Sequence, residues 1–121
     1  MYELEHHRER AKKLLSEILF SGVVKDPRVR GIFITRTVLS TDKSVLKVFY
    51  SITAIKNETY DAKQKKAAAG LNKAKGFIRR HLGKALGWRL TPELVFIYDD
   101  SLDKAERIDH ILKDIHKNER P

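Results

Sequence analysis

Cysteine is absent from this sequence, and long apolar runs are absent too. Without cysteine the chain can form no disulfide, use no thiol in catalysis and bind no metal through sulfur. No run of apolar residues approaches the roughly 18 needed to cross a membrane. The charged start of the chain, Met1 to Arg8, lacks the apolar core of a signal peptide. We therefore expect a soluble, cytoplasmic protein that is not anchored in a membrane.

Acidic residues are few in comparison with basic ones. The chain has 16 Asp and Glu against 25 Lys and Arg, which gives a formal net charge of +9 on 121 residues. A surplus of this size favours polyanionic partners, either nucleic acid or an anionic membrane surface. The hydrophobic fraction of 41% is sufficient for a core, so we expect one domain over residues 1–121.

Almost all of the charge surplus lies between Thr59 and Leu90. This stretch has nine basic residues and one acid, Asp61, and so carries +8 of the total of +9. The basic residues are Lys63, Lys65, Lys66, Lys73, Lys75, Arg79, Arg80, Lys84 and Arg89.

The same stretch has a helical pattern that passes through Gly76. Apolar residues at 67, 71, 74, 78, 82 and 85 keep a spacing of three or four. This spacing predicts a kinked pair of helices with one continuous apolar face and Gly76 at the bend. Backbone N–H groups at the start of the second helix would then form a natural phosphate site.

Other periodic segments surround this helix pair. Residues 3–20 carry one apolar stripe and predict a helix, which Gly22 ends. Residues 32–39 are rich in β-branched residues, and residues 45–54 alternate, with Leu46, Val48, Tyr50 and Ile52 on one face. The short polar connection between the two segments predicts an antiparallel hairpin. Residues 94–98 predict a third strand and 102–116 a last helix.

These elements predict an α+β fold in the order α-β-β-α-(kink)-α-β with a C-terminal helix. A three-stranded sheet would be covered by helices on one face. The third strand, 94–98, is nearly all apolar, so we expect it to be central or buried on both faces.

Enzymatic groupings are not evident. The five histidines show no metal-ligand spacing, and adjacent His6 and His7 point to different faces of a helix. A cap at the start of the last helix explains Asp99 and Asp100 more simply than acid–base catalysis does. We expect no enzyme, no metal and no cofactor.

A lysine-rich helix is often only a solvated surface, but two features favour nucleic acid here. The stretch lacks the glutamates that usually pair with lysines four residues away. Gly76 also lies among four cations, Lys73, Lys75, Arg79 and Arg80. Aromatic residues are few here, so we expect contacts to the nucleic-acid backbone and shape rather than base stacking.

The chain order resembles a type II KH domain, which grips nucleic acid through a GxxG loop. This sequence has Ala74-Lys75-Gly76 in place of GxxG, and with that departure it resembles the bacterial ribosome-binding factor A family over about residues 3–115. The segments that carry the resemblance are Val24–Arg28, Leu39–Asp42, Lys47–Ser51, Ala74–Arg79, Leu82-Gly83, Arg89–Phe96 and Asp99–Ser101.

The resemblance implies a small-subunit maturation factor that is not an enzyme. Such a factor binds the free 30S subunit, not the 70S ribosome, and assists late processing of 16S rRNA near its 5′ end and the decoding region, above all in the cold. It uses no cofactor, and a GTPase assembly factor helps to release it. We expect a monomer in the cytoplasm.

Residues and resemblance together indicate one RNA-binding surface. The expected RNA-binding residues are Lys63, Lys66, Lys73, Ala74, Lys75, Gly76, Arg79, Arg80 and Lys84. Loop residues Arg28, Arg30 and Lys43 are weaker candidates.

Two alternatives remain at this point. The protein could be a general nucleic-acid binder without ribosome specificity, for example through a helix-turn-helix in which residues 77–82 read DNA. A basic amphipathic surface on an anionic membrane is the other alternative. It requires an exposed apolar face, whereas the apolar face predicted here packs on the sheet.

Overall fold

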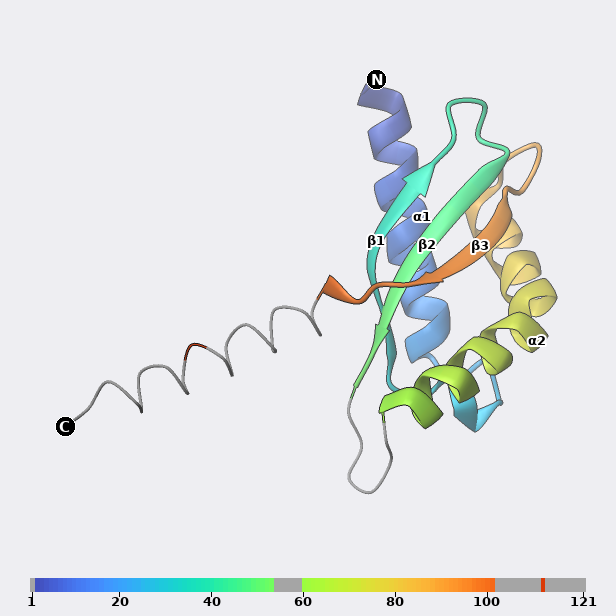
Figure 1. Ribbon diagram of the computed structural model, residues 1–121. Helices are drawn as coiled ribbons and strands as arrows, with labels where there is room; N and C mark the ends of the chain where they lie inside the picture. Colours follow the sequence, from blue (N-terminus) through green and yellow to red (C-terminus); the bar gives the residue numbers. More distant parts are fainter. Residues whose placement is uncertain (1, 54–59, 102–111, 113–121) are drawn as a thin grey trace.

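A helix, a β-hairpin, a long helix and a third strand follow one another along the chain (Figure 1). The computed structural model describes residues 2–53, 60–101 and 112. Its elements are α1 (Tyr2–Phe20), the 3-10 helix η1 (Pro27–Val29), β1 (Ile32–Leu39), β2 (Val45–Ile52), α2 (Tyr60–Leu86) and β3 (Glu93–Tyr98). The α+β class is confirmed. The last helix, predicted over 102–116, lies outside the described residues apart from Leu112 and is not tested.

The three strands form one mixed sheet in the order β1-β2-β3. β1 and β2 pair antiparallel, as the short polar connection between them predicts, and β2 pairs parallel with β3. The expectation that β3 is central is therefore wrong: β2 is the central strand, and β3 forms an edge. Apolar character misled the prediction because Val95, Phe96 and Ile97 are only half-buried.

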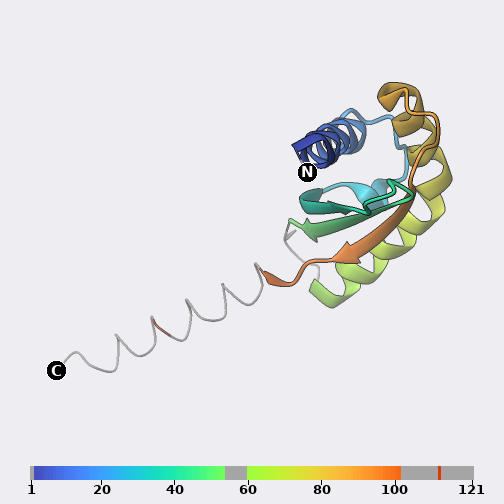
Figure 2. The ribbon, with the colours of Figure 1, turned by 90° about the horizontal axis from the view of Figure 1, so that it is seen from above.

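The core lies between one face of the sheet and the two helices. Leu46, Val48, Tyr50 and Ile52 of β2 are buried, which confirms the alternation seen in the sequence. α1 packs against β1 and α2, and α2 packs against β3 and η1. Figures 1 and 2 show α1 behind the sheet and α2 running past the β3 side. No helix in the described part of the chain is long and apolar enough to cross a membrane.

The predicted pair of helices is a single helix. α2 is helical from Tyr60 to Leu86 without interruption, so no second helix begins after Gly76. The helix axis nevertheless changes direction along its length (Figure 1). Ala67, Leu71, Ile78 and Leu82 are buried as predicted, but Leu86, not Ala85, continues the stripe. Burial of this stripe on both sides of Gly76 outweighs the roughly 1 kcal/mol by which glycine disfavours a helix interior.

Candidate nucleic-acid interface

The outer surface of α2 is built around a line of small residues. Lys65, Ala69, Asn72, Gly76 and Arg80 are all exposed and are spaced three or four residues apart, so they follow one another along one side of the helix. The middle of this line has only short side chains. A cation stands at each end. We call these five residues the outer line of α2.

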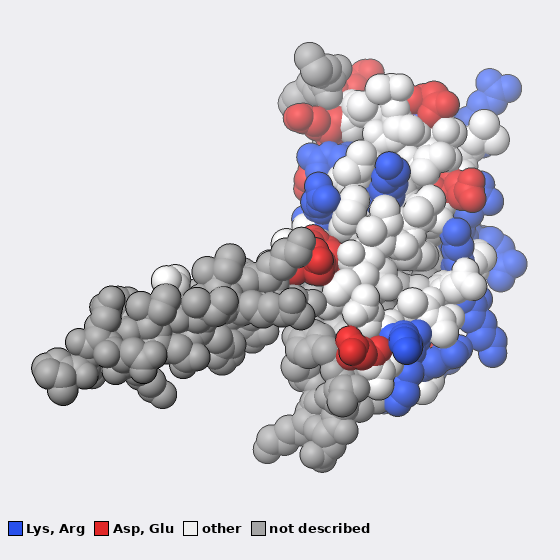
Figure 3. Space-filling view, in the orientation of Figure 1, with Lys and Arg blue, Asp and Glu red and all other residues white. Residues whose placement is uncertain are grey.

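Further cations stand on both sides of the outer line. The helical spacing puts Lys73 on the side of η1 and Lys75 on the side of β3. Lys65, Lys73, Lys75, Arg80 and Lys84 form no ion pair with any carboxylate in the described part of the chain. Figure 3 shows the Lys and Arg side chains gathered along the α2 side of the molecule, whereas the sheet between the edges is mostly uncharged. Such a surface attracts a polyanion.

Gly76 lies inside the uninterrupted helix α2. Its φ is not positive, and a Cβ added at this position would meet no atom within 4 Å. The fold therefore does not require glycine here. Its missing side chain leaves the helix backbone open to close approach from outside.

Lys63 does not belong to this surface. Its residue is only 5% exposed, and its Nζ donates a hydrogen bond to the carbonyl oxygen of Thr53. Nζ also lies 3.0 Å from the position that a Cβ on Gly31 would occupy. The prediction that Lys63 faces rRNA is therefore wrong: this ammonium group joins the start of α2 to the end of β2.

Arg79 has a structural task as well as a charge. Its Nε donates to the carbonyl oxygen of Pro92 at 3.1 Å, and its Nη2 donates to that of Thr91 at 2.7 Å. These two bonds tie α2 to the loop that leads into β3. Although Arg79 is exposed, the hydrogen bonds fix its guanidinium group beside β3.

The end of α2 is fixed by α1 and by a glycine. Arg10 Nη1 donates to the carbonyl oxygen of Leu86 and Nη2 to that of Ala85, both at 3.0 Å. Gly87 follows in the left-handed region with a φ of +66°. A cation on the last carbonyls and a left-handed glycine are both common ways to end a helix. The position of Lys84, one turn earlier, is fixed with it.

The three loop candidates lie at different places. Arg28 packs beside Gly70 of α2, and its guanidinium group binds the carboxylate of Asp26. Arg30 is exposed just after η1. Lys43, in the hairpin turn, has a φ of +62°, and its Nζ lies 5.7 Å from the ring centroid of Trp88. Arg28 thus lies beside the first half of α2, Arg30 lies on the side of α1 and β1, and Lys43 lies near the end of α2.

Two further cations belong to the interface by geometry. Lys65 stands at the start of the outer line, and Lys25 is exposed on a groove that also contacts Lys73. Counting positions along an unbroken helix would have found Lys65. Nothing in the sequence brings Lys25 near α2, because that proximity depends on the packing of η1 against Gly70.

Within the described residues, no group of three or more His, Asp or Glu could hold a metal ion. The carboxylate of Asp99 takes part in the fold instead. Its Oδ2 accepts from Thr35 Oγ1 at 2.6 Å, and its Oδ1 accepts from the backbone N–H of Ser101 at 3.0 Å. These hydrogen bonds, first the one from Thr35, lower the pKa of Asp99 from 3.8 to about 2.

Comparison with known proteins gives a consistent result. The model of the ribosome-binding factor A family matches residues 4–112. A ribosome-binding factor A of Geotalea uraniireducens is 38% identical over 112 residues, which are 93% of this chain and 87% of that relative.

Solved structures agree. The solution structure of a Thermotoga maritima protein, proposed to be a ribosome-binding factor A, has a TM-score of 0.67 at 29% identity and covers 83% of this chain and 90% of its own. A homology model of the Thermus thermophilus factor, fitted into the cryo-electron-microscopy map of its 30S complex, has a TM-score of 0.62 at 23% identity, with 79% and 94% covered. This chain belongs to the ribosome-binding factor A family.

Proposed function

We propose that this protein binds the free 30S ribosomal subunit through α2 and assists late maturation of 16S rRNA. The observation that carries the proposal is the outer line of α2, where short side chains lie between cations that form no ion pair with a described carboxylate. Family membership supports the ribosomal target, since the Thermus thermophilus factor has been fitted into a map of a 30S complex. The proposal contains no catalytic step and no cofactor.

The proposed contact residues lie on the part of α2 that is not buried in the core. They are Lys65, Lys66, Lys73, Ala74, Lys75, Gly76, Arg80 and Lys84, with Arg79 as a secondary contact. Lys63 is removed because it is buried. The cations would contact phosphates, and the short side chains would let the RNA backbone come close to the helix.

The finer parts of the proposal follow from the family. The protein acts as a monomer in the cytoplasm, matters most in the cold and is released with the help of an assembly GTPase. We infer from the family resemblance that the fold is a type II KH-like domain in which Ala74-Lys75-Gly76 replaces the GxxG loop. One continuous helix at that position supports recognition of folded rRNA over the grip of an extended single strand.

A charge-reversal experiment tests the proposal. We expect the double substitution Lys75→Glu and Arg80→Glu to weaken cosedimentation with free 30S subunits by roughly 10-fold or more, because like charges would face the phosphates. Both side chains extend from the surface of α2 and support no described hydrogen bond, so the melting temperature should change little. Lys12→Glu with Lys13→Glu on α1 is the matched control, since it changes the net charge equally.

Two results would contradict the proposal. Equal losses in the α1 and α2 variants would mean that only the net charge matters. Binding of the unaltered protein to random duplex DNA as strongly as to 30S subunits, across a range of salt concentrations, would favour a general nucleic-acid binder.

A further inference from the structure

A groove separates residues 23–28 from the middle of α2. It has a volume of about 590 Å³. Its apolar lining comes from Val23, Val24 and Pro27 on one side and from Ala74 and Phe77 on the other. Of the proposed contact residues, Lys73 and Ala74 line this groove. The outer line of α2 lies outside it.

The wall formed by the loop is held in place by its own hydrogen bonds. Asp26 caps η1, with Oδ1 accepting from the backbone N–H of Arg28 at 3.0 Å. The Arg28 guanidinium group donates to both carboxylate oxygens, at 3.0 Å and 2.6 Å. Gly70 lets this turn lie directly on α2, since an added Cβ would come within 2.9 Å of the Arg28 Cβ. The groove is therefore formed before any ligand arrives.

The rim of the groove is positively charged. The Asp26 carboxylate is already paired with Arg28, whose side-chain hydrogen bonds lower the pKa of Asp26 to about 2. Lys25 and Lys73 stand exposed at the rim and form no ion pair with a described carboxylate. An anionic group at the mouth of the groove would meet two ammonium groups.

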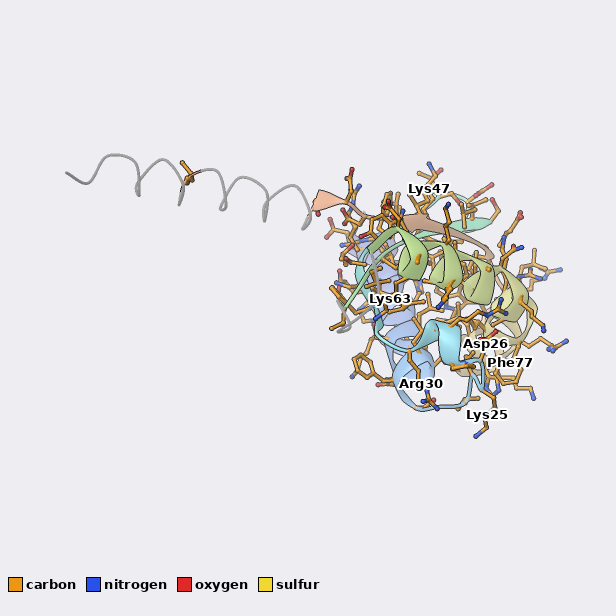
Figure 4. All side chains as sticks on the ribbon, turned by 60° about the horizontal axis from the view of Figure 1, so that its bottom comes forward. Lys25, Asp26, Arg30, Lys47, Lys63 and Phe77 are labelled. Carbon is orange, nitrogen blue, oxygen red and sulfur yellow. The ribbon has the colours of Figure 1, made fainter. Side chains whose placement is uncertain are left out.

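Phe77 gives the groove an aromatic surface. The ring is partly buried, and on one side it packs against His81, with 4.5 Å between ring centroids and 55° between planes. Figure 4 labels Phe77, Asp26 and Lys25 close to one another, the first from α2 and the others from the loop. A flat apolar surface beside exposed cations suits a flat ring that carries a phosphate. An aliphatic side chain of a protein would use the apolar lining and leave both lysines without a partner.

We propose that this groove binds one unstacked nucleotide of RNA, with the base against Phe77 and Val24 and its phosphate at Lys25 and Lys73. The inference rests on the proposed function, because it adds a stacking contact with a base to the phosphate contacts of α2. Single nucleotides that leave a helix are the parts of folded RNA that proteins recognise by stacking.

Substitutions at Phe77 test the inference on the full chain with purified free 30S subunits. We expect Phe77→Leu, which keeps an apolar side chain but removes the ring, to weaken binding about 5- to 150-fold, the range that loss of a stacking aromatic causes. Phe77→Tyr should retain most of the affinity. Phe49→Leu is the matched control, because it makes the same change at another partly buried phenylalanine, which lies on β2 under Arg36.

A photoreactive phenylalanine analogue at position 77 identifies the ligand. We expect its crosslink to map to one unpaired nucleotide of 16S rRNA, and we expect Lys25→Gln to reduce the yield. A crosslink to a ribosomal protein, together with full affinity of Phe77→Leu, would overturn the inference in favour of a protein side chain. If Phe77→Leu binds normally while Lys75→Glu with Arg80→Glu does not, the inference fails and the proposed function stands.

Discussion

Gly76 is the residue whose place in the structure differs most from the prediction made from the sequence. Its sequence context predicts a junction between two helices, but it lies inside one continuous helix, and a Cβ added to it would meet no residue outside that helix. Glycine in a helix interior lowers stability by roughly 0.5–1 kcal/mol relative to alanine. A residue that costs stability and fills no packing requirement points to a task outside the fold, and the task proposed here is close approach of RNA to α2.

Gly76→Ala should therefore separate stability from binding. We expect the free energy of unfolding to rise by roughly 0.5–1 kcal/mol and the affinity for free 30S subunits to fall, because the new methyl group stands where RNA comes closest. Urea unfolding and cosedimentation measure the two quantities. Gly70→Ala is the control, and it should lose stability because its Cβ would meet Arg28. If Gly76→Ala binds normally, the RNA contacts lie on another part of α2.

Two other residues show why single positions are hard to predict. Lys63 reads as one more surface lysine, yet its ammonium group binds the carbonyl oxygen of Thr53, ten residues earlier. Arg79 reads as an RNA contact, yet it binds two carbonyl oxygens in the loop before β3. In both cases the partner is a backbone carbonyl, which every residue has, so side-chain patterns contain no signal for it.

At the scale of elements, the sequence predicts where α1 and β1 begin and end better than it predicts the order of strands in the sheet or the continuity of α2. The predicted segments 3–20 and 32–39 agree with α1 and β1 within one residue at each end, because apolar periodicity and turn residues are local. The continuity of α2 and the edge position of β3 depend on long-range packing. Ala74, Gly76 and several lysines of α2 are candidates from the sequence alone, but the groove beside them requires the contact between η1 and Gly70.

At the register shift in β1, a side-chain hydrogen bond connects β1 to the residue that follows β3, and its contribution to stability should depend on pH. The register between β1 and β2 shifts at Ile34/Arg36, and Thr35, the residue between them, donates its hydroxyl to Asp99 just after β3. The pKa of Asp99 is lowered in the folded state, so its stabilising effect is present above about pH 4 and is lost as pH falls towards 2. We expect Thr35→Val to cost about 1 kcal/mol at pH 7.

The free energy of unfolding of Thr35→Val should approach that of the unaltered protein as the pH falls from 4 to 2. Urea unfolding at each pH measures this difference. Thr41→Val, in the exposed hairpin turn, is the control and should show no such dependence. A difference that stays constant down to pH 2 would mean that the hydroxyl stabilises the fold through the Phe49 carbonyl oxygen, 3.3 Å away, and not through Asp99.

At the scale of the whole molecule, the positive charge is unevenly distributed. The residues from Thr59 to Leu90 carry +8 of the net +9, and Figure 3 shows the cations along the α2 side. A molecule with this distribution should meet RNA with α2 first, because its field orients it during approach. Composition alone predicts a polyanionic partner, because net charge does not depend on how the chain packs.

The salt dependence of 30S binding measures how many of these cations contact phosphates. The six cations proposed as primary contacts would give a slope of log K against log salt of about −4 to −5, at about 0.7 to 0.9 per phosphate neutralised. They are Lys65, Lys66, Lys73, Lys75, Arg80 and Lys84. Replacement of any one of them by glutamine should reduce the slope by somewhat less than 1. Arg79→Gln should leave the slope nearly unchanged and lower the melting temperature instead, since its guanidinium group serves the Thr91 and Pro92 carbonyls. If Arg79→Gln reduces the slope as much as Lys75→Gln does, the rRNA lies over the β3 side of α2; an unchanged slope leaves the outer line as the contact surface.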